Sequence, residues 1–564
     1  MQRLPTANSQ PRWLFPLVLI LVGLLSALPL GRLLLAGIEA SLEAGGLPPV
    51  LSERGTWIAL RNTLSTAFFG MAISVVIGSA FAFATTLTDI RAKRALSFAF
   101  MLPMMIPPQI TALSWVEMSG PASPLLKTLG IAPPLGSPQP LYSIGGISLL
   151  LGVQHAPLVF LALKAGLAAI PRDGVEAARL AGAGPFRVFR DIVLPLAVPG
   201  LIAGASIAFV SGVGNFGIPA ILGSPGSIFT LPTLVYSRLA SFGSQTFGDL
   251  AALSLLIAVI CAVGLVLQQR ALAGRDYRTI GLSGSVPAFS WGLSRIVVEA
   301  ALWGLLAVIL VAPFVALVAS SLVPAYGVPL NSETVSLRAY EEVLWRQQVT
   351  RVAFANSMFL ALAAALILLL LSSVTAYLLT RHRGVALRLL SLFIEVPYAL
   401  PGIVLAVAFI LLLAAPLPGL GFTLYGTIWI ILIAYLSSFF AVSLKPIESA
   451  FLQLDPALEE AARLSGAGFW RRMRDILVPM MAPAAGASVV LVFLIACNEL
   501  TVSALLWSAG TQTLGVAIYN LDDSGSSDIA AALSVLVVLL VVALMGVLEM
   551  LARYMPRGVL PWRN

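Results

Sequence analysis

The sequence predicts an all-α, polytopic membrane protein built from two similar halves, and three observations lead to this prediction. Hydrophobic residues make up 59% of the 564 residues and charged residues only 10%, whereas a soluble domain has about 25% charged residues. The apolar runs are long enough to cross a bilayer as helices and too long for barrel strands. One nine-residue segment occurs twice, at 176–184 and at 460–468. We therefore expect about twelve transmembrane helices in two repeated six-helix halves with pseudo-two-fold symmetry.

Each apolar run is interpreted as one spanning helix, because a helix satisfies its own backbone hydrogen bonds in lipid. The first run follows Arg3 and Arg12 and has no convincing small-residue cleavage site, so we interpret it as an uncleaved helix rather than a signal peptide. The expected spans are 13–38, 62–87, 95–118, 144–168, 194–222, 249–272, 295–321, 353–380, 388–415, 425–449, 480–508 and 529–553.

The expected domain organisation follows the repeat. The segment between the halves is short, polar and rich in glycine and serine, which is typical of a linker. The chain is divided into an N-terminal segment with the first helix (1–61), a first repeated core (62–272), a cytoplasmic linker (273–294), the seventh helix with an outer loop (295–355), a second repeated core (356–553) and a cytoplasmic tail (554–564).

The basic residues indicate how the chain is oriented in the lipid bilayer. With the N-terminus inside, cytoplasmic segments and helix ends hold 25 of the 33 lysines and arginines, and the opposite side holds eight. Because basic residues are enriched in cytoplasmic loops, both termini and both repeated segments are expected in the cytoplasm. The same rule explains the net charge of +8 without nucleic acid as a partner.

The repeated segment reads Glu-Ala-Ala-Arg-Leu-Ala-Gly-Ala-Gly in its first copy. The second copy lies 284 residues later and is identical at eight of nine positions, with Ser465 in place of Ala181. An amphipathic connector on the membrane surface is the alternative interpretation, but it leaves this repetition unexplained.

Each copy predicts a short helix that ends at a glycine. Asp173, with an acidic residue three positions later, fits a capping pattern, and Asp455 followed by Pro456 fits an N-cap with proline at the first helical position. Gly182 and Gly466 are placed to end the helices, because glycine adopts the left-handed conformation at little cost.

The repeated segment resembles the EAA loop of type I ABC importer permeases, over roughly 62–268 and 356–550. In that family the loop forms a cytoplasmic coupling helix that docks into a groove on the ATPase subunit. The resemblance implies a permease of the bacterial inner membrane, with two copies of a cytoplasmic ABC ATPase and a periplasmic substrate-binding protein as partners. The residues that it assigns to ATPase coupling are Glu176, Ala177, Ala178, Gly182, Glu460, Ala461, Ala462 and Gly466.

The chain is not expected to be an enzyme. The phosphate-binding loop of such ATPases needs a lysine directly after a glycine, and none of the four lysines follows one. The resemblance therefore implies that ATP and Mg belong to the partner ATPase and that this chain has no cofactor. Cys261 and Cys497 lie in apolar runs, which predicts neither a disulfide nor a spaced-cysteine metal site.

A second resemblance concerns the substrate. Asn215–Pro219 resembles an aspartate-Phe-Gly-Thr-Pro segment of fused ferric-iron permeases, and Glu499–Leu506 resembles their Glu-Leu-Pro-x-Thr-Leu-Leu-Leu segment. Tyr277–Ile280 resembles the tail of their first half. Asn215 replaces the usual aspartate and Thr501 the usual proline. The resemblance implies ferric iron, with thiamine, an aminophosphonate or a polyamine as alternatives. An ion-driven secondary transporter, which can also contain parallel repeats, is the alternative of another class.

Polar residues in or near the apolar runs are candidates for the translocation pathway, because an ionisable group at bilayer depth is costly unless it has a function or a partner. Structural pairing and an interfacial position are the competing interpretations. We predict that Glu499 lines a central cavity near the interface of the halves, opposite its aligned counterpart Asn215. No metal site is firmly predicted. The candidates are Glu117, Asn215, Glu395, Asn498 and Glu499, with His155 as a further buried polar residue.

Prolines interrupt two of the expected spans. Pro103, Pro107 and Pro108 lie in the third span, and Pro397 and Pro401 lie in the ninth. Such breaks expose backbone carbonyl groups, which is tolerable only where protein or water satisfies them. We expect kinked helices at these positions that line the pathway or pack against neighbouring helices.

Overall fold

The computed structural model describes residues 13–134, 136–168, 170–241, 246–273, 289–325, 327–382, 384–416, 419 and 421–551. Within these ranges the chain folds into helices and forms no strand, although Thr88 and Phe289 pair in an isolated bridge. The all-α prediction is therefore confirmed. The expected tail, most of the expected linker and the segment Tyr277–Ile280 lie outside the described residues.

Ten helices in the described part of the chain are long and apolar enough to cross a membrane, and the total reaches twelve if each of two bent pairs is one span. The prediction of about twelve transmembrane helices is confirmed. The ten helices are Leu14–Glu43, Arg54–Leu87, Ile144–Ala168, Pro185–Gly214, Thr246–Leu272, Arg295–Ser321, Gln348–Arg381, Ile428–Gln453, Phe469–Cys497 and Ser527–Val547.

The third and ninth expected spans are not continuous helices. The chain bends by 99° between α5 (Lys93–Met105) and the segment that begins with α6 (Pro108–Ser119). It bends by 110° between α19 (Val385–Ala399) and α20 (Gly402–Leu413). The prediction of one helix across 95–118 and one across 388–415 is wrong in this respect, and the predicted breaks are much sharper than kinks.

Proline accounts for both bends. Ile106 and Leu400 stand directly before Pro107 and Pro401, and their ψ angles of 134° and 144° are extended rather than helical. The proline ring clashes with the backbone of the preceding residue in the helical conformation, so a helix usually ends there. The two halves therefore break their corresponding helices by the same means.

The described residues form two compact units, and each is described by itself. Unit 1 contains 13–39, 352–514 and 541–551, and unit 2 contains 40–351 and 515–540. Unit 1 thus combines the second repeated core with the N-terminal helix, and unit 2 combines the first repeated core with the expected seventh helix (295–321) and with residues 515–540. Four helices contribute to both units, namely α2 (Leu28–Glu43), α18 (Gln348–Arg381), α26 (Leu514–Asp523) and α27 (Ser527–Leu551).

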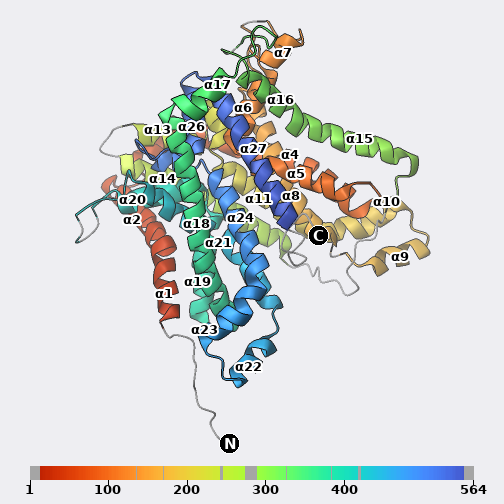
Figure 1. The fold of residues 1–564 in the computed structure, drawn as a ribbon, viewed down its shortest axis with the longest axis vertical. Coiled ribbons are helices and arrows are strands. Elements are labelled where there is room, and N and C mark those ends of the chain that lie inside the picture. The colour runs from red at the N-terminus through yellow and green to blue at the C-terminus, as the bar shows by residue number, and fades with distance from the viewer. Residues whose placement is uncertain are drawn as a thin grey trace, which may run out of the picture. The chain divides into compact units, whose positions relative to one another are not determined.

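Unit 1 is built on the second repeated core. The N-terminal helix packs against this core, where Ser437 Oγ donates to the Leu25 carbonyl at 2.6 Å and Ser26 Oγ donates to the Phe393 carbonyl. Helices α21 and α24 pack along each other (Figure 1). The elements of unit 1 besides α19 and α20 are α1 (Leu14–Val22), the π-helical turn η1 (Gly23–Ala27), α18 (Gln348–Arg381), α21 (Ile428–Gln453), α22 (Pro456–Leu464), α23 (Phe469–Arg472), the π-helical turn η6 (Met473–Leu477), α24 (Val478–Cys497) and α25 (Ser503–Leu506).

Unit 2 is built on the first repeated core, in which α4 (Arg54–Leu87), α8 (Ile144–Ala168) and α11 (Leu194–Gly214) pack closely. Small residues permit this approach, since a Cβ atom added at Gly78 of α4 would lie 2.5 Å from the Ala156 carbonyl oxygen of α8. Helix α16 (Ala312–Ser321) packs on α6, where Ser320 Oγ donates to the buried carboxylate of Glu117.

The elements of unit 2 besides α5 and α6 follow the order of the chain. They are α3 (Pro49–Ser52), α4 (Arg54–Leu87), α7 (Pro124–Thr128), α8 (Ile144–Ala168), α9 (Arg172–Leu180), α10 (Pro185–Val188), the π-helical turn η2 (Phe189–Val193), α11 (Leu194–Gly214), α12 (Gly217–Gly223), α13 (Leu231–Ala240), α14 (Thr246–Leu272), the 3-10 turn η3 (Gly292–Ser294), α15 (Arg295–Leu306), the π-helical turn η4 (Ala307–Val311), α16 (Ala312–Ser321), α17 (Arg338–Glu341), the π-helical turn η5 (Glu342–Arg346) and α26 (Leu514–Asp523).

Candidate functional site

The first repeated segment folds as a short helix that ends in a left-handed glycine. Gly182, just after α9, has φ of +81°. Its N–H donates to the Arg179 carbonyl at 2.9 Å, and the Ala183 N–H donates to the Ala178 carbonyl at 2.9 Å. These two bonds form a Schellman motif, which satisfies carbonyl groups that the end of a helix would otherwise leave unpaired.

The second repeated segment has the same geometry. Gly466, just after α22, has φ of +79°. Its N–H donates to the Arg463 carbonyl at 3.0 Å, and the Ala467 N–H donates to the Ala462 carbonyl at 3.0 Å. The left-handed glycine predicted for each copy is confirmed. We call residues 171–190 the first coupling loop and residues 455–474 the second coupling loop.

The two helices begin differently. In the second coupling loop, Asp455 Oδ1 accepts a hydrogen bond from the Ala457 N–H at 2.9 Å and Pro456 is the first helical residue, as predicted. In the first, the helix begins at Arg172 after Pro171, and the N-cap has no side-chain hydrogen bond. The prediction that Asp173 caps this helix is wrong, because Asp173 lies inside its first turn. There its carboxylate still has a favourable position near the positive end of the helix dipole.

Large apolar side chains stand exposed on both coupling loops. Leu180 is 91% exposed and its aligned counterpart Leu464 is 83% exposed. Phe186 and its counterpart Trp470 are also exposed. An exposed apolar patch of this kind is typical of a contact with another protein. Of the residues assigned to coupling, Glu176, Ala177, Gly182, Glu460, Ala461 and Gly466 are exposed, and Ala178 and Ala462 are half-buried.

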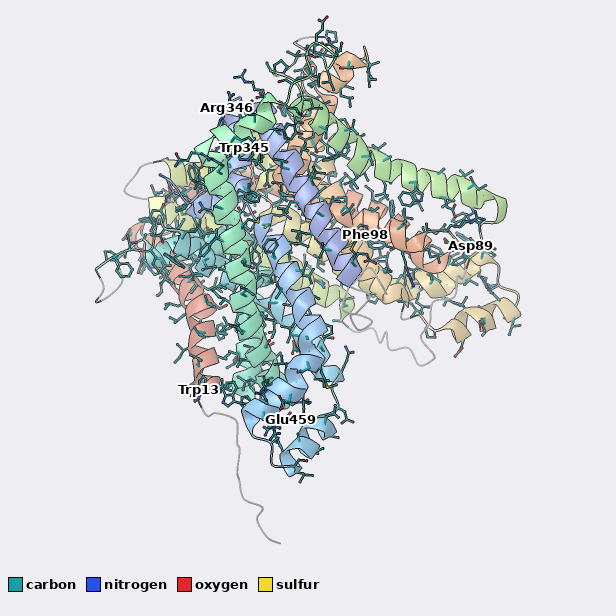
Figure 2. The ribbon with its side chains drawn as sticks, in the orientation of Figure 1. Trp13, Asp89, Phe98, Trp345, Arg346 and Glu459 are labelled. Carbon is teal, nitrogen blue, oxygen red and sulfur yellow. The ribbon has the colours of Figure 1, made fainter. Side chains whose placement is uncertain are left out.

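One buried side chain anchors each of these short helices, and the two anchors differ in chemistry. Among the described side chains of α9 only Val175 is buried, and in α22 only Glu459 is buried. The two residues are aligned at the same offset of 284 as the rest of the repeat. Figure 2 places Glu459 at the end of unit 1 that holds α22 and α23.

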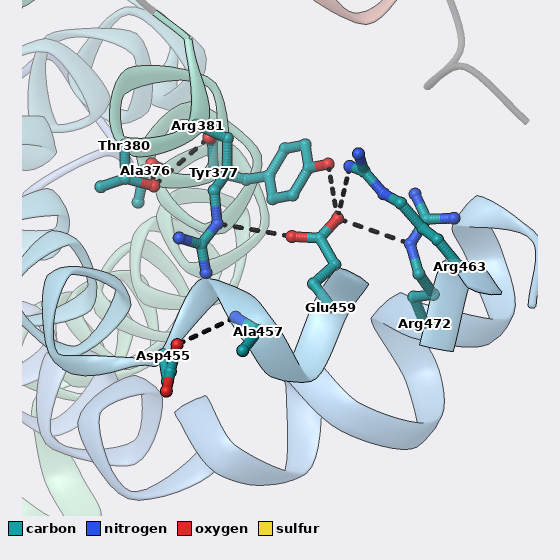
Figure 3. A network of polar contacts seen from close by, with 9 residues as sticks. All are labelled: Ala376, Tyr377, Thr380, Arg381, Asp455, Ala457, Glu459, Arg463 and Arg472. Atoms are coloured by element: carbon teal, nitrogen blue, oxygen red, sulfur yellow. Dashed lines mark hydrogen bonds and ion pairs between the residues drawn. The ribbon is translucent and has the colours of Figure 1, made fainter. Parts of the chain in front are cut away.

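The Glu459 carboxylate is the centre of a polar network (Figure 3). Its Oε1 atom accepts hydrogen bonds from the Tyr377 hydroxyl at 3.1 Å and from Arg463 Nη2 at 2.9 Å. Arg472 Nε lies 3.4 Å from Oε1, and Arg381 Nε lies 3.4 Å from Oε2. Three guanidinium groups therefore surround one buried carboxylate. Sequence reasoning missed this network, although the replacement of an apolar residue by a charged one between the two copies was a usable signal.

The predicted pathway residues Asn215 and Glu499 both bind backbone N–H groups. Asn215 Oδ1 accepts from the Ile218 N–H at 3.1 Å. Glu499 Oε1 accepts from the Val502 N–H at 2.6 Å, and Oε2 accepts from the Ser503 N–H at 3.0 Å. Asn215 lies in unit 2 and Glu499 lies in unit 1. That the two side chains face each other across the interface of the halves therefore stays a prediction.

The helices before these residues end earlier than expected. The spans predicted at 194–222 and 480–508 are each interrupted, because α11 ends at Gly214 and α24 ends at Cys497. Glu499 therefore lies in a turn before α25, not midway along a helix. Its side chain supplies hydrogen-bond acceptors to backbone groups that this turn leaves without helical partners.

The remaining polar candidates are scattered. Glu395 of α19 forms an ion pair with Lys445 of α21, and both side chains are exposed. Asn498 is the half-buried C-cap residue of α24. His155 is buried in α8. Within unit 1 the structure thus brings Asn498 and Glu499 together in one turn and does not group Glu395 with them in any described contact.

Glu117 lines a cavity of about 220 Å³ in unit 2. Asp522, Asp523, Tyr142 and Tyr519 also line it, so three carboxyl groups face one polar cavity. Burial raises the pKa of the Asp522 carboxyl group. Asp522 and Asp523 lie between the expected spans 480–508 and 529–553, and the sequence gives no signal that they line a cavity with a residue of the third span. In the described part of the chain, no group of three or more His, Cys, Asp or Glu side chains is placed to hold a metal ion.

The fold and the two coupling loops define a multi-pass membrane permease with an internal repeat. The family of binding-protein-dependent transport system inner membrane components matches residues 74–273 and 369–558, which include one coupling loop each. The chain belongs to this family. It is therefore an ABC importer permease subunit with two fused halves, and a substrate-binding protein is its partner.

Three relatives show the range of this family. The ABC transporter permease protein y4fN of Sinorhizobium fredii is 27% identical over 90% of this chain and 87% of its own length. A ferric transport system permease protein, FbpB 1 of Haemophilus influenzae, is 25% identical over 82% of this chain and 71% of its own length. A 2-aminoethylphosphonate transport system permease protein, PhnU of Salmonella choleraesuis, is 29% identical over 48% of this chain and 95% of its own length.

Proposed function

We propose that this permease imports ferric iron and that two copies of a cytoplasmic ABC ATPase drive it by binding the two coupling loops. The observation that carries the proposal is the doubled helix-and-glycine geometry. Helices α9 and α22 end in the same Schellman motif, and the last residue of each is an exposed leucine. An exposed aromatic residue, Phe186 or Trp470, follows each helix. Two equivalent docking surfaces suit two identical partner subunits.

The requirement for a separate ATPase follows from the sequence. The chain has no lysine after a glycine, so it lacks the phosphate-binding loop with which such ATPases hold ATP. Exposed leucine and aromatic side chains on the coupling loops are suited to the core of a protein interface. ATP and Mg accordingly belong to the partner, and this chain supplies the pathway and the docking surfaces.

Two observations support ferric iron as the cargo. The relative named as a ferric transport permease aligns with both halves of this chain, whereas the relative named for 2-aminoethylphosphonate aligns with about one half. The cavity lined by Glu117, Asp522 and Asp523 suits a cation in unit 2. Its three carboxyl groups are not arranged as a metal site, which suits a pathway that must release its cargo. The aminophosphonate is the strongest competitor because of its named relative.

The proposed direction is from the periplasm to the cytoplasm, with both termini in the cytoplasm of the bacterial inner membrane. The uneven distribution of lysine and arginine supports this orientation. The coupling loops then face the compartment that contains ATP.

Transport into reconstituted vesicles tests the function. The permease is purified with its ATPase, and candidate binding proteins are added on the outside with one radiolabelled substrate at a time. We expect ATP-dependent uptake of ferric iron with a ferric-binding protein and no uptake of 2-aminoethylphosphonate with its own binding protein.

Each alternative has a distinct outcome in this assay. Uptake of the aminophosphonate alone would reject ferric iron and keep the importer class. Uptake that needs an ion gradient but no ATPase would reject the importer and favour the secondary transporter. A variant with Leu464→Asp tests docking directly, because a charged group in the apolar patch should prevent ATPase binding.

A further inference from the structure

We propose that Glu459 is a positioning residue of the transport cycle, which holds the coupling helix α22 in one orientation against the cytoplasmic end of α18. The proposal rests on the proposed function, since it requires the second coupling loop to bind an ATPase. Glu459 itself does not face the exposed patch, because only 4% of its surface is accessible. Its role is therefore to fix the surface that the partner binds.

The contacts of Glu459 join three elements. Tyr377 and Arg381 come from the last two turns of α18, which is a 34-residue helix long enough to span a membrane. Arg472 comes from α23 and is 1% exposed, and its Nη1 atom also donates to the Ala467 carbonyl at 2.9 Å. Arg463 comes from α22 itself. One carboxylate thus links the coupling helix to a spanning helix and to the chain that returns from the loop.

This link is directional. Hydrogen bonds to a carboxylate from arginine and tyrosine depend on angle and distance, whereas an apolar contact depends mainly on the area removed from water. If α22 turned relative to α18, the buried guanidinium groups would lose their only carboxylate partner in this network. An uncompensated buried charge is strongly unfavourable. We conclude that α22 and the end of α18 move as one body.

The first half provides an internal comparison. Helices α4 and α18 have equal lengths and align end to end at an offset of 294, so Phe83 corresponds to Tyr377 and Leu87 to Arg381. In the coupling loops, Val175 corresponds to Glu459 and Val188 to Arg472 at the offset of 284. Four of the five corresponding residues in the first half are therefore apolar, namely Phe83, Leu87, Val175 and Val188. The exposed Arg463 is the exception, because its counterpart Arg179 is also an arginine.

The coupling-loop positions are buried in both halves, Val175 and Val188 in the first and Glu459 and Arg472 in the second. On the spanning helices, Phe83 is half-buried where Tyr377 is buried, and Leu87 is buried where Arg381 is half-buried. Leu87, Val175 and Val188 are buried, and Phe83 packs edge-on against Phe189 of the returning chain at 5.3 Å between ring centroids. The first coupling helix is thus held by non-directional contacts, and the second is held by a charged network. We infer that α22 turns less relative to α18 than α9 turns relative to α4 when the ATPase subunits move. The second coupling loop would then transmit more of this movement to its spanning helix.

The test uses three variants of the fused chain, assembled with the ATPase in vesicles. Glu459→Gln keeps the shape of the side chain and removes its charge. Asp475→Asn is the matched control, because this carboxylate also pairs with two arginines near the same loop but is exposed, and exposed pairs contribute little. The quadruple variant Y377F/R381L/E459V/R472V installs the residues of the first half. ATPase binding, ATP hydrolysis and substrate uptake are measured for each.

For Glu459→Gln we expect ATPase binding to persist and uptake per ATP hydrolysed to fall roughly tenfold, since a misplaced group can cost this much or more. Asp475→Asn should have the same uptake per ATP hydrolysed as the wild type. The quadruple variant should have most of the wild-type value, because an apolar contact replaces the charged network. Wild-type uptake per ATP in Glu459→Gln would overturn the proposal. So would a quadruple variant that binds the ATPase but stays uncoupled.

Failure of the proposed function gives a different result. If Leu464→Asp leaves ATPase binding intact, the second coupling loop is not the docking surface, and this holds whatever Glu459→Gln does. If Glu459→Gln is too unstable to assemble because its buried guanidinium groups are unpaired, the quadruple variant decides the question, since it removes those buried charges. If the quadruple variant does not fold, Glu459→Gln and its control decide it, because neither changes the volume of a buried side chain appreciably.

Discussion

Asn215 and Glu499 accept a hydrogen bond from the same relative position, the backbone N–H three residues later. The bond is 3.1 Å to Ile218 in the first half and 2.6 Å to Val502 in the second. Both residues follow the end of a long helix and precede a short one. In each half, therefore, the polar side chain at this position stabilises the turn between two helices. This is the structural interpretation of these residues, as opposed to a role in the translocation pathway.

Removal of this acceptor should destabilise the protein. We expect Asn215→Ala to lower the free energy of unfolding by about 1 kcal/mol, as for the loss of other capping side chains. Glu499→Gln should cost about 1 kcal/mol as well, because one of two backbone N–H groups would then face an amide NH2 group. Thermal unfolding in detergent measures both effects.

Glu395→Gln is the control for these variants, since the exposed ion pair with Lys445 contributes little. Loss of cation transport in Glu499→Gln with an unchanged unfolding temperature would contradict the structural role and favour the pathway.

The left-handed glycines of the coupling loops give a second prediction. Gly182 has φ of +81° and Gly184, two residues later, has φ of −70°, and neither position has an atom within 4 Å of an added Cβ. Alanine at 182 should therefore cost roughly 1 kcal/mol through backbone strain alone, and alanine at 184 should cost little. Valine at Gly182 or Gly466 should uncouple ATP hydrolysis from transport while the protein still inserts, because the helix end moves.

The comparison of Gly182→Ala with Gly184→Ala isolates conformation from packing. Substrate-stimulated ATP hydrolysis and uptake are measured in the same vesicles. Equal coupling in the two alanine variants would show that the left-handed turn is not required for docking, and normal coupling in both valine variants would refute the prediction.

Local patterns were the features that the sequence could predict well. The repeat located both coupling loops, and glycine and Asp455-Pro456 indicated where the helices end and begin, since these effects depend on a few neighbouring residues. Proline indicated where two spans break but not the bends of 99° and 110°, which depend on how each following helix packs. Asp173 fitted a cap pattern, but the helix began one residue before it.

Contacts between residues far apart in the sequence could not be predicted from local sequence patterns. Glu459 meets Tyr377, 82 residues away, and Glu117 meets Ser320, 203 residues away. The arrangement that brings helix α16 onto α6, and α26 into the unit of the first half, depends on the tertiary packing of whole helices. The burial of Glu459 and Glu117 could not be predicted either, because a charged residue is expected on the surface unless its partner is known.

The orientation of the loops gives a third prediction, which rests on the distribution of basic residues. Single cysteines introduced into 119–143 and 509–528, in a background without Cys261 and Cys497, should react with an impermeant thiol reagent added to intact cells. Cysteines in 176–190 and 460–474 should react only after the membrane is opened. Labelling of either coupling loop from outside would overturn the proposed topology and with it the ATPase docking surface.

The acidic cavity of unit 2 gives the last prediction, which links pH to cargo. Asp522 lies outside the helices that are long enough to span a membrane, and burial raises the pKa of its carboxyl group, with an opposing hydrogen bond from Ser527 and a further increase from Asp523. Because the folded protein holds this proton more tightly than the unfolded chain, its contribution to stability is complete below the unfolded pKa and is lost as the pH rises through the folded pKa. The free energy of unfolding should therefore fall as the pH rises above about 4, and Asp522→Asn should flatten this part of the profile. A cation in the cavity favours the ionised carboxylate, so a soluble trivalent cation should restore stability at the higher pH in the wild type and less so in Asp522→Asn, which should also import ferric iron more slowly. An unchanged pH profile together with unchanged ferric uptake in Asp522→Asn would remove this cavity from the pathway.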